Sequence, residues 1–215
     1  MINKSKDLYY QLIESLFCTL GLVIFALFIH KSFPLLIVAF LGLLMAAFII
    51  NRNIKVLSDI PFIFGMKPLS RSLLLYLIIG LLIGILLGFV FRGRKGYSFL
   101  PEKLTYFVFI AAIIGSAEEV VFRGFIQGHL RPLGLTFSIL FATLSHTLYK
   151  TGLFFSPSST VEINLIFLAQ WTFIVGILLG ILKEFSQNVF PALIAHACFD
   201  VLVYGDYPEA PWWVW

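Results

Sequence analysis

Residues 70–91 read Ser-Arg-Ser-Leu-Leu-Leu-Tyr-Leu-Ile-Ile-Gly-Leu-Leu-Ile-Gly-Ile-Leu-Leu-Gly-Phe-Val-Phe, a run in which Arg71 is the one charged residue. A transmembrane helix needs about 20 consecutive, mainly apolar residues, so this run predicts a membrane-spanning helix. Gly80, Gly84 and Gly88 recur at intervals of four within it. This spacing puts small residues on one helix face, where the backbone of a neighbouring helix can approach closely.

Similar apolar runs lie on both sides of this one. They cover residues 9–29, 33–50, 104–127, 134–155, 163–182 and 188–204. None shows the alternating pattern of a membrane barrel, and an open sheet edge would leave backbone groups unpaired in hydrocarbon. The sequence therefore predicts an all-α fold, a polytopic membrane helix bundle of about seven transmembrane helices.

The composition supports the same fold class. Of the 215 residues, 60% are hydrophobic and only 12% are charged, against roughly a quarter charged in an ordinary soluble domain. We therefore expect one membrane domain over residues 1–215, in a multi-pass protein of the cell membrane. The net charge of +4 comes from basic residues scattered between apolar runs, where they suit lipid headgroups, so we expect no nucleic-acid partner. Cys18 and Cys198 are too few for a disulfide framework or a four-thiolate zinc site.

Three ionisable residues interrupt the run at 104–127: Glu118, Glu119 and Arg123. Each costs roughly 2.5–3.5 kcal/mol near the centre of an inserted helix. Glu119 and Arg123 are four residues apart, so we expect an ion pair that offsets part of this cost. Glu118 points about 100° away around the helix, and we expect it to be the unpaired carboxylate and the candidate general base.

Two later runs add further polar residues. His146 lies in the run at 134–155, and His196 and Asp200 share one helix face in the run at 188–204. At about 1.5 Å per residue, Glu118, His146 and His196 all fall within roughly 5 Å of the bilayer centre. We therefore expect these side chains to line one cavity.

The residues by themselves leave the chemistry of this cavity open. A carboxylate base and two imidazoles can activate water and stabilise the oxyanion of an attacked amide. The set Glu118, His146 and His196 could instead hold zinc, with an open coordination position. The same groups could also form a proton or cation path in a transporter.

The motifs resemble those of one known family. Glu118-Glu119-Val-Val-Phe-Arg123 is similar to the Glu-Glu-x-x-x-Arg signature of the CAAX protease and bacteriocin-processing enzymes, the abortive-infection or type II CAAX prenyl endopeptidase family. His196-Ala-Cys-Phe-Asp200 resembles its His-x-x-x-Asn/Asp motif, preceded here by Phe190-Pro-Ala. The resemblance covers about residues 104–204, the expected catalytic core. The middle motif departs from the family's Phe-x-x-x-His, because Phe141 stands five residues before His146 and Ala142 stands four before it.

The resemblance implies an intramembrane, glutamate-dependent endopeptidase that cleaves a peptide or a prenylated protein. Glu118 and His146 would activate water, His196 and Asp200 would serve the oxyanion, and Glu119 with Arg123 would support them. Since aspartate donates a hydrogen bond only when protonated, we expect Asp200 mainly to orient His196. No cofactor is expected to be required, with zinc as the alternative.

Two other functions remain as alternatives. The first is a non-catalytic immunity or scaffold protein that keeps the pocket, and the second is a small proton-coupled transporter. Transporters usually show symmetric halves with paired broken helices. Residues 1–103 contribute no intramembrane acid that would face the cluster, which disfavours the transporter.

Overall fold

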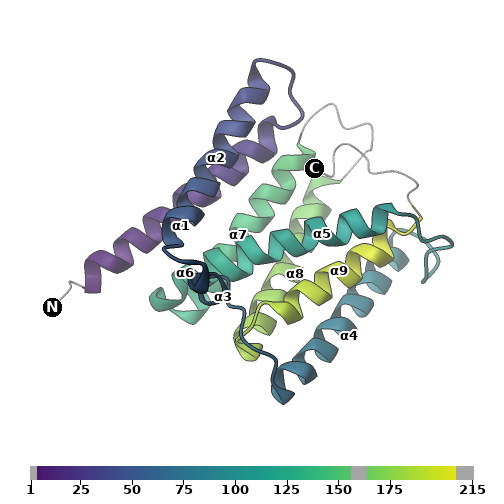
Figure 1. The fold of residues 1–215 in the computed structure, drawn as a ribbon. Coiled ribbons are helices and arrows are strands. Elements are labelled where there is room, and N and C mark those ends of the chain that lie inside the picture. Colours follow the sequence, from purple (N-terminus) through teal and green to yellow (C-terminus); the bar gives the residue numbers. More distant parts are fainter. Residues whose placement is uncertain (1–3, 156–163, 207–215) are drawn as a thin grey trace.

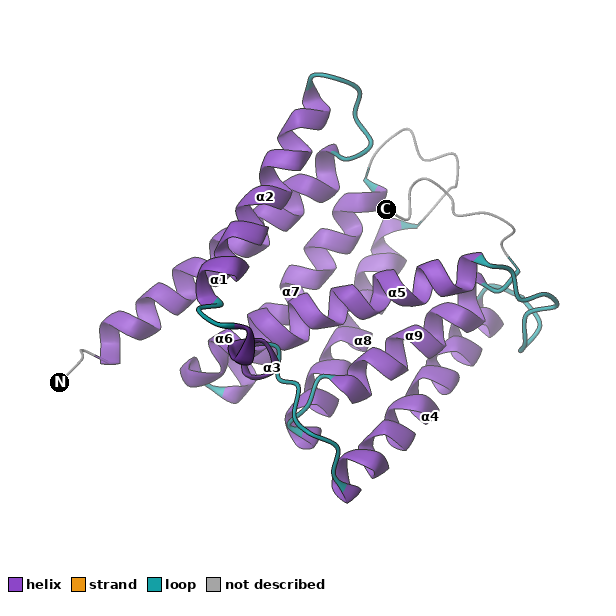
Figure 2. Ribbon diagram, in the orientation of Figure 1, coloured by secondary structure: helices purple, strands orange, loops and turns teal. Residues whose placement is uncertain are grey.

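The computed structural model describes residues 4–155 and 164–206, and within these ranges its regular structure is helical, with no strand (Figure 2). The elements are α1 (Lys4–Phe28), α2 (Leu35–Asn53), η1 (Leu57–Asp59), α3 (Ile60–Ile63), α4 (Arg71–Arg94), α5 (Phe107–Glu119), η2 (Val120–Gln127), α6 (Gly128–Leu130), η3 (Arg131–Leu133), α7 (Leu135–Phe154), α8 (Leu165–Ser186) and α9 (Phe190–Tyr204). The predicted all-α class is confirmed.

Every apolar run of the sequence corresponds to a helical segment. Among the described residues, α1 from Asp7 onward, α2, α4 and α8 are long and apolar enough to cross a membrane. The remaining three segments are α5 with η2, α7 and α9. Each of these segments is either shorter than the four spanning helices or more polar than they are. Together they carry the charged and imidazole side chains described below. The chain is thus an integral membrane protein in which four helices span by length and apolarity, and less apolar helices hold the polar residues.

The helices form two connected groups, a bundle of α4, α5, α7, α8 and α9 and a hairpin of α1 and α2 (Figure 1). In the first group α5 packs on α9, and α9 packs in turn on α4. α7 and α8 pack on each other, and α8 also contacts α9. The α1–α2 hairpin joins the bundle through α1, which packs on α7. This arrangement brings α5, α7 and α9 around one interior region.

The glycines of α4 lie at the contact with α9, as their spacing predicts. A Cβ atom on Gly80 would collide with the backbone of Pro191, and one on Gly84 would collide with the backbone of Ala195. Gly88 faces the side chain of Leu202 in the same way. Because these three positions lack side chains, the backbones of α4 and α9 come into direct contact. α9 is therefore held at a fixed depth in the bundle.

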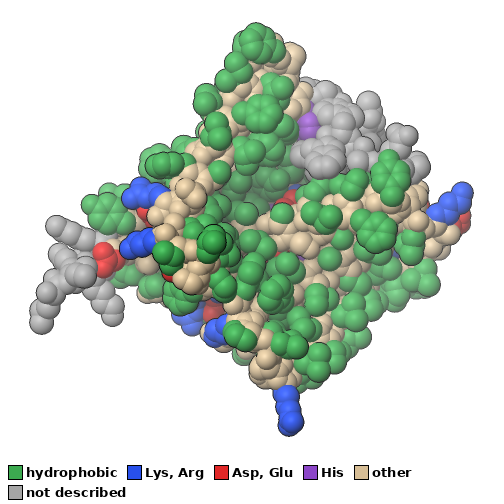
Figure 3. Space-filling model, viewed as in Figure 1, with side chains coloured by type: hydrophobic (Ala, Val, Ile, Leu, Met, Phe, Trp, Pro, Cys, Tyr) green, Lys and Arg blue, Asp and Glu red, His purple; other side chains and the backbone are tan. Residues whose placement is uncertain are grey.

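The distribution of polar and apolar side chains is inverted relative to that of a soluble protein. Hydrophobic side chains are spread over the visible face, and most of the charged side chains lie near its edges (Figure 3). The exposed large hydrophobic residues are mainly leucine, isoleucine and phenylalanine. Glu119 and Arg123 are completely buried, and Arg92 is 1% exposed. A surface of this kind suits hydrocarbon, in which each buried polar group needs a partner inside the protein.

Arg92, near the end of α4, is the hydrogen-bond and ion-pair partner of several groups around the end of α9. Its guanidinium donates to the carbonyl oxygens of Ser98, Leu100 and Leu202, and it forms an ion pair of 2.9 Å with Asp206. Burial by itself would raise the pKa of the Asp206 carboxyl. The hydrogen bond that Arg92 donates to this carboxyl, together with two from backbone N–H groups, holds its pKa below the usual range. The contacts fix the end of α9 one to two turns beyond Asp200.

Candidate active site

Three helical segments supply the polar side chains. α5 ends with Glu118 and Glu119, and η2 carries Arg123. His146 belongs to α7, while His196 and Asp200 belong to α9. All six side chains are buried, with residue exposures between 0% and 9%. The structure therefore brings Glu118, His146 and His196, which the sequence placed at one depth, together in one interior cluster with the other three side chains.

Glu118 makes two contacts of different kinds. Its Oε2 lies 3.1 Å from Nε2 of His146, and its Oε1 lies 2.6 Å from Nζ of Lys150. The expectation that Glu118 is an unpaired carboxylate is wrong, because Lys150 neutralises it. The sequence reasoning missed Lys150, which lies near the end of α7. The signal was present, since Lys150 follows His146 by four residues and so shares its helix face.

Arg123 connects the second glutamate to the first histidine. The predicted ion pair with Glu119 is present, with Nε at 3.2 Å from Oε2, although without the alignment of a hydrogen bond. Nη1 of Arg123 lies 2.6 Å from Nδ1 of His146. Because a guanidinium can only donate, Nδ1 accepts this bond, and the contact assigns the imidazole proton to Nε2. His146 then donates from Nε2 to Glu118.

An aromatic ring covers the face of His146. The ring of Phe122 stacks on this imidazole at 4.6 Å between centroids and 23° between planes. Phe141, the residue shifted by one position from the family pattern, packs against Phe137 at 5.9 Å. Phe122 lies in η2, whose helix is of the wider π type. Such π segments are rare and are frequent at functional sites.

His196 is oriented by Glu119. Its Nδ1 donates to Oε1 of Glu119 at 2.7 Å, which leaves Nε2 facing the interior of the cluster. This Nε2 atom lies 3.8 Å from Oε2 of Glu118 and 3.7 Å from Oδ2 of Asp200. Asp200 therefore sits beyond hydrogen-bond distance, and the orienting contact that the sequence assigned to it belongs to Glu119. Asp200 instead faces the same nitrogen that faces Glu118.

The charges of the cluster balance when one proton is shared between His196 and Asp200. Three carboxylates face two cationic side chains, and with a neutral His146 this leaves one negative charge to compensate. A buried charge without a partner costs several kcal/mol, so a proton on the His196–Asp200 pair is favoured. The carboxylates are those of Glu118, Glu119 and Asp200, and the cations are Arg123 and Lys150.

Gly115 lets α5 approach α9 at the cluster. A Cβ atom there would collide with Oδ2 of Asp200 and would lie 2.9 Å from Cδ2 of His196. Since Gly115 precedes Glu119 by one helical turn, any side chain at this position would push His196 away from Glu119.

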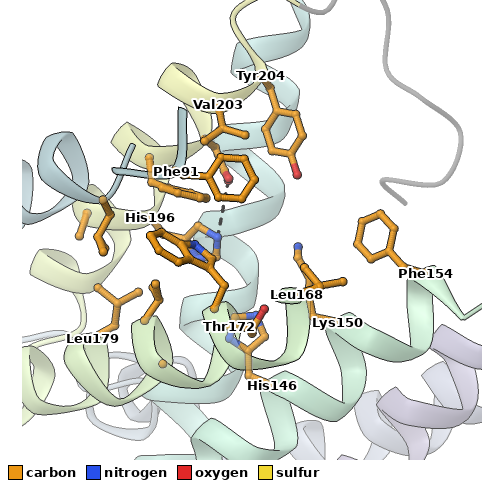
Figure 4. Close-up of a pocket in the computed structure, with 17 residues that line it drawn as sticks. Phe91, His146, Lys150, Phe154, Leu168, Thr172, Leu179, His196, Val203 and Tyr204 are labelled. Atoms are coloured by element: carbon orange, nitrogen blue, oxygen red, sulfur yellow. Dashed lines mark ion pairs between the residues drawn. The ribbon is translucent and has the colours of Figure 1, made fainter. Parts of the chain in front are cut away.

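A pocket opens beside the cluster and reaches toward α4 and α8. It contains about 690 Å³ of space not filled by atoms, part of which is open to the outside. His146 and Lys150 project into it from α7, and His196 projects into it from α9 (Figure 4). The rest of its wall is mainly apolar and comes from residues such as Phe91, Leu168 and Val203. A substrate in this pocket would contact both imidazoles.

The residues named for zinc lie close together, but their contacts fit one another better than they fit a metal. Oε2 of Glu118 already accepts from His146, and its Oε1 holds the ammonium of Lys150. A cation on the metal's own carboxylate ligand would repel a dication. Within residues 4–155 and 164–206, no group of three or more His, Cys, Asp or Glu side chains has the arrangement of a metal site.

The fold and the cluster define a class: a polytopic helical membrane protein with a buried acid–histidine site open to an apolar pocket. Residues 100–202 match the family model described as type II CAAX prenyl endopeptidase Rce1-like. The segment of the chain that runs from just before α5 to α9 is therefore similar to this family. No curated protein and no solved structure matches the chain. The family is one of CAAX-type membrane proteases, and the match covers every residue of the cluster.

Proposed function

We propose that this protein is a glutamate-dependent intramembrane endopeptidase in the cell membrane, which cleaves a peptide or a prenylated protein with Glu118 as the general base. One observation carries the proposal: the Nε2 atoms of His146 and His196 face the same carboxylate oxygen of Glu118, at 3.1 Å and 3.8 Å. A water molecule at this oxygen would have an acceptor for its proton and two imidazoles beside it. The match of residues 100–202 to the family model supports protease chemistry.

The first step is the activation of water. The carboxylate of Glu118 takes one proton from water, while Nε2–H of His146 shifts its hydrogen bond from Oε2 of Glu118 to the water oxygen and directs a lone pair of that oxygen at the substrate carbonyl carbon. The tautomer that Arg123 imposes on His146 makes this donation available. A bond forms between the water oxygen and the carbonyl carbon, and the carbonyl electron pair moves to its oxygen.

The second step is the collapse of the tetrahedral intermediate. The negative oxygen receives a hydrogen bond from Nε2 of His196, which carries the proton shared with Asp200. Glu119 keeps His196 in place through Nδ1. The carbon–nitrogen bond then breaks, and the proton held by Glu118 passes to the leaving amine. A carboxylic acid and an amine result, and the carboxylate of Glu118 is regenerated.

The test is hydrolysis by purified protein in lipid nanodiscs. Short unmodified peptides and the same peptides with an S-farnesylated cysteine are incubated in H₂¹⁸O, and the products are identified by mass spectrometry. We expect cleavage with one ¹⁸O in the new carboxylate, and none with Glu118→Ala. If no peptide of either set is cut by the wild-type protein, or if Glu118→Ala cuts them equally, the proposal is wrong.

A further inference from the structure

Three aromatic rings form part of the pocket wall. Phe91 of α4, Trp171 of α8 and Phe199 of α9 all line the pocket. The ring of Phe91 lies 5.7 Å from that of Trp171 and 5.6 Å from that of Phe199, and Trp171 stacks on Phe199 at 6.4 Å and 29°. We refer to these three residues as the aromatic wall. Its members come from three different helices and pack on one another, so its shape is well fixed.

Trp171 also carries an unused hydrogen-bond donor. Its Nε1 atom is buried and finds no acceptor among the residues that the structure describes. A buried indole N–H normally has a partner, and leaving one unpaired in a low-dielectric region costs about 1–3 kcal/mol. A native structure that keeps such a group on a residue that lines a pocket calls for a physical reason. A ligand that brings its own acceptor would supply one.

We propose that Trp171 is a substrate-binding residue, whose indole N–H donates to a main-chain carbonyl oxygen of an unmodified peptide while the aromatic wall holds the adjacent apolar side chain. This inference rests on the proposed function and names the part of the substrate that the pocket takes. A lipid chain would fill the apolar space but would leave the indole N–H unpaired, because hydrocarbon has no acceptor. A peptide in extended conformation offers a carbonyl oxygen and a side chain within one residue.

The distance to the catalytic groups fits a peptide. The ring of Phe199 lies 6.4 Å from that of His196 and 6.4 Å from that of Trp171. An extended chain advances about 3.3 Å per residue, so the carbonyl bound by Trp171 lies at most about four residues from the scissile bond. Trp171 therefore contacts the substrate close to the cleavage site, and it contributes to the choice of sequence there.

Peptide binding, measured without turnover, tests the inference. The Glu118→Gln protein is titrated with a fluorescein-labelled unmodified peptide that has leucine or phenylalanine at its centre. In a set of analogues, one carbonyl at a time is removed by an (E)-alkene isostere, which keeps the extended geometry. We expect one analogue to bind about three- to tenfold more weakly than its parent, the loss that corresponds to one neutral hydrogen bond.

The same titrations in a Trp171→Phe background show which residue is responsible. The parent peptide should bind about three- to tenfold more weakly there, and the difference between parent and the sensitive analogue should vanish. Phe167→Leu is the matched control. Phe167 stacks on Trp171 at 6.1 Å but does not line the pocket, so that variant should keep the difference. Should Trp171→Phe fail to fold, equal binding of all analogues to the Trp171 protein would still overturn the inference.

Three outcomes overturn the inference. The first is equal binding of all analogues, and the second is the same loss with and without Trp171. The third is tight, Trp171-dependent binding of only the farnesylated peptide, which would make the pocket a lipid site. Binding that follows the predicted pattern, together with no cleavage by the wild-type protein, would contradict the proposed function and leave the role of Trp171 standing.

Discussion

Nζ of Lys150 lies 2.6 Å from Oε1 of Glu118, so the first glutamate of the cluster is one half of a buried ion pair. The contact occupies one carboxylate oxygen and leaves the other, Oε2, facing both imidazoles. In the proposed mechanism Lys150 is a positioning residue, because it acts through Glu118 and not on the substrate.

Replacing Lys150 by methionine should lower both stability and cleavage. Removing one partner of a buried ion pair costs about 3–5 kcal/mol, and the 17% exposure of the Lys150 side chain puts the expected loss near the lower end. The measurements are the thermal unfolding midpoint in detergent and the rate of peptide cleavage. Lys103→Met, at an exposed lysine, is the control and should change neither.

A double variant separates the ion pair from a general effect of methionine. Lys150→Met combined with Glu118→Gln leaves no charge in the pair, so its unfolding midpoint should recover relative to Lys150→Met alone. A midpoint that stays low in the double variant would mean that Lys150 stabilises the fold through other contacts.

The hydrogen bond from Arg123 should be visible in the protonation of His146. Because the guanidinium donates to Nδ1, we expect the neutral Nε2–H tautomer for this residue. The ¹⁵N chemical shifts of a histidine-labelled sample, assigned with a His146→Gln variant, measure it directly. A resonance pair typical of the Nδ1–H tautomer would contradict the proposed donation to water.

Gly115→Ala should separate α5 from α9 at the cluster. The added methyl group would meet the side chains of His196 and Asp200, and overpacking of this kind costs about 1–3 kcal/mol. We expect a lower unfolding midpoint and a loss of cleavage. Gly93→Ala is the matched control, since a Cβ atom there meets nothing within 4 Å, and it should be neutral for both properties. Equal effects of the two substitutions would refute the close approach.

Cleavage should not depend on zinc. We expect elemental analysis of the purified protein to find no stoichiometric metal, and we expect cleavage to survive dialysis against a chelator. The physical reason is the ammonium of Lys150, which already occupies the carboxylate that zinc would need. One tightly bound zinc per chain, with activity lost on chelation and restored by zinc, would overturn this prediction.

The sequence predicted the helices well because apolar length is a local property. The run at 70–91 became α4 (Arg71–Arg94), and its glycines face α9 as their spacing required. The pair of Glu119 with Arg123 was also predictable, since residues four apart on a helix must be neighbours.

Contacts between different helices were the part that local reasoning could not give. Lys150 lies near the end of its apolar run, where a lysine normally extends to the headgroups, and only the packing of α7 on η2 turns it toward Glu118. The hydrogen bond from Nδ1 of His196 to Glu119 likewise depends on how closely α5 and α9 approach each other at Gly115. The π segment η2 left no signal in the apolar pattern, yet it carries both Arg123 and the ring that stacks on His146.

The rate of peptide cleavage by Glu118→Gln, compared with Glu102→Gln at equal amounts of folded protein, tests the central claim most directly. Glu102 is exposed, so its variant is a matched change of charge outside the cluster. A general base contributes about 10²- to 10⁴-fold to the rate, so Glu118→Gln should lose at least about a hundredfold while Glu102→Gln keeps the wild-type rate. A Glu118→Gln protein that cleaves within about tenfold of the wild-type rate would contradict the assignment of Glu118 as the base.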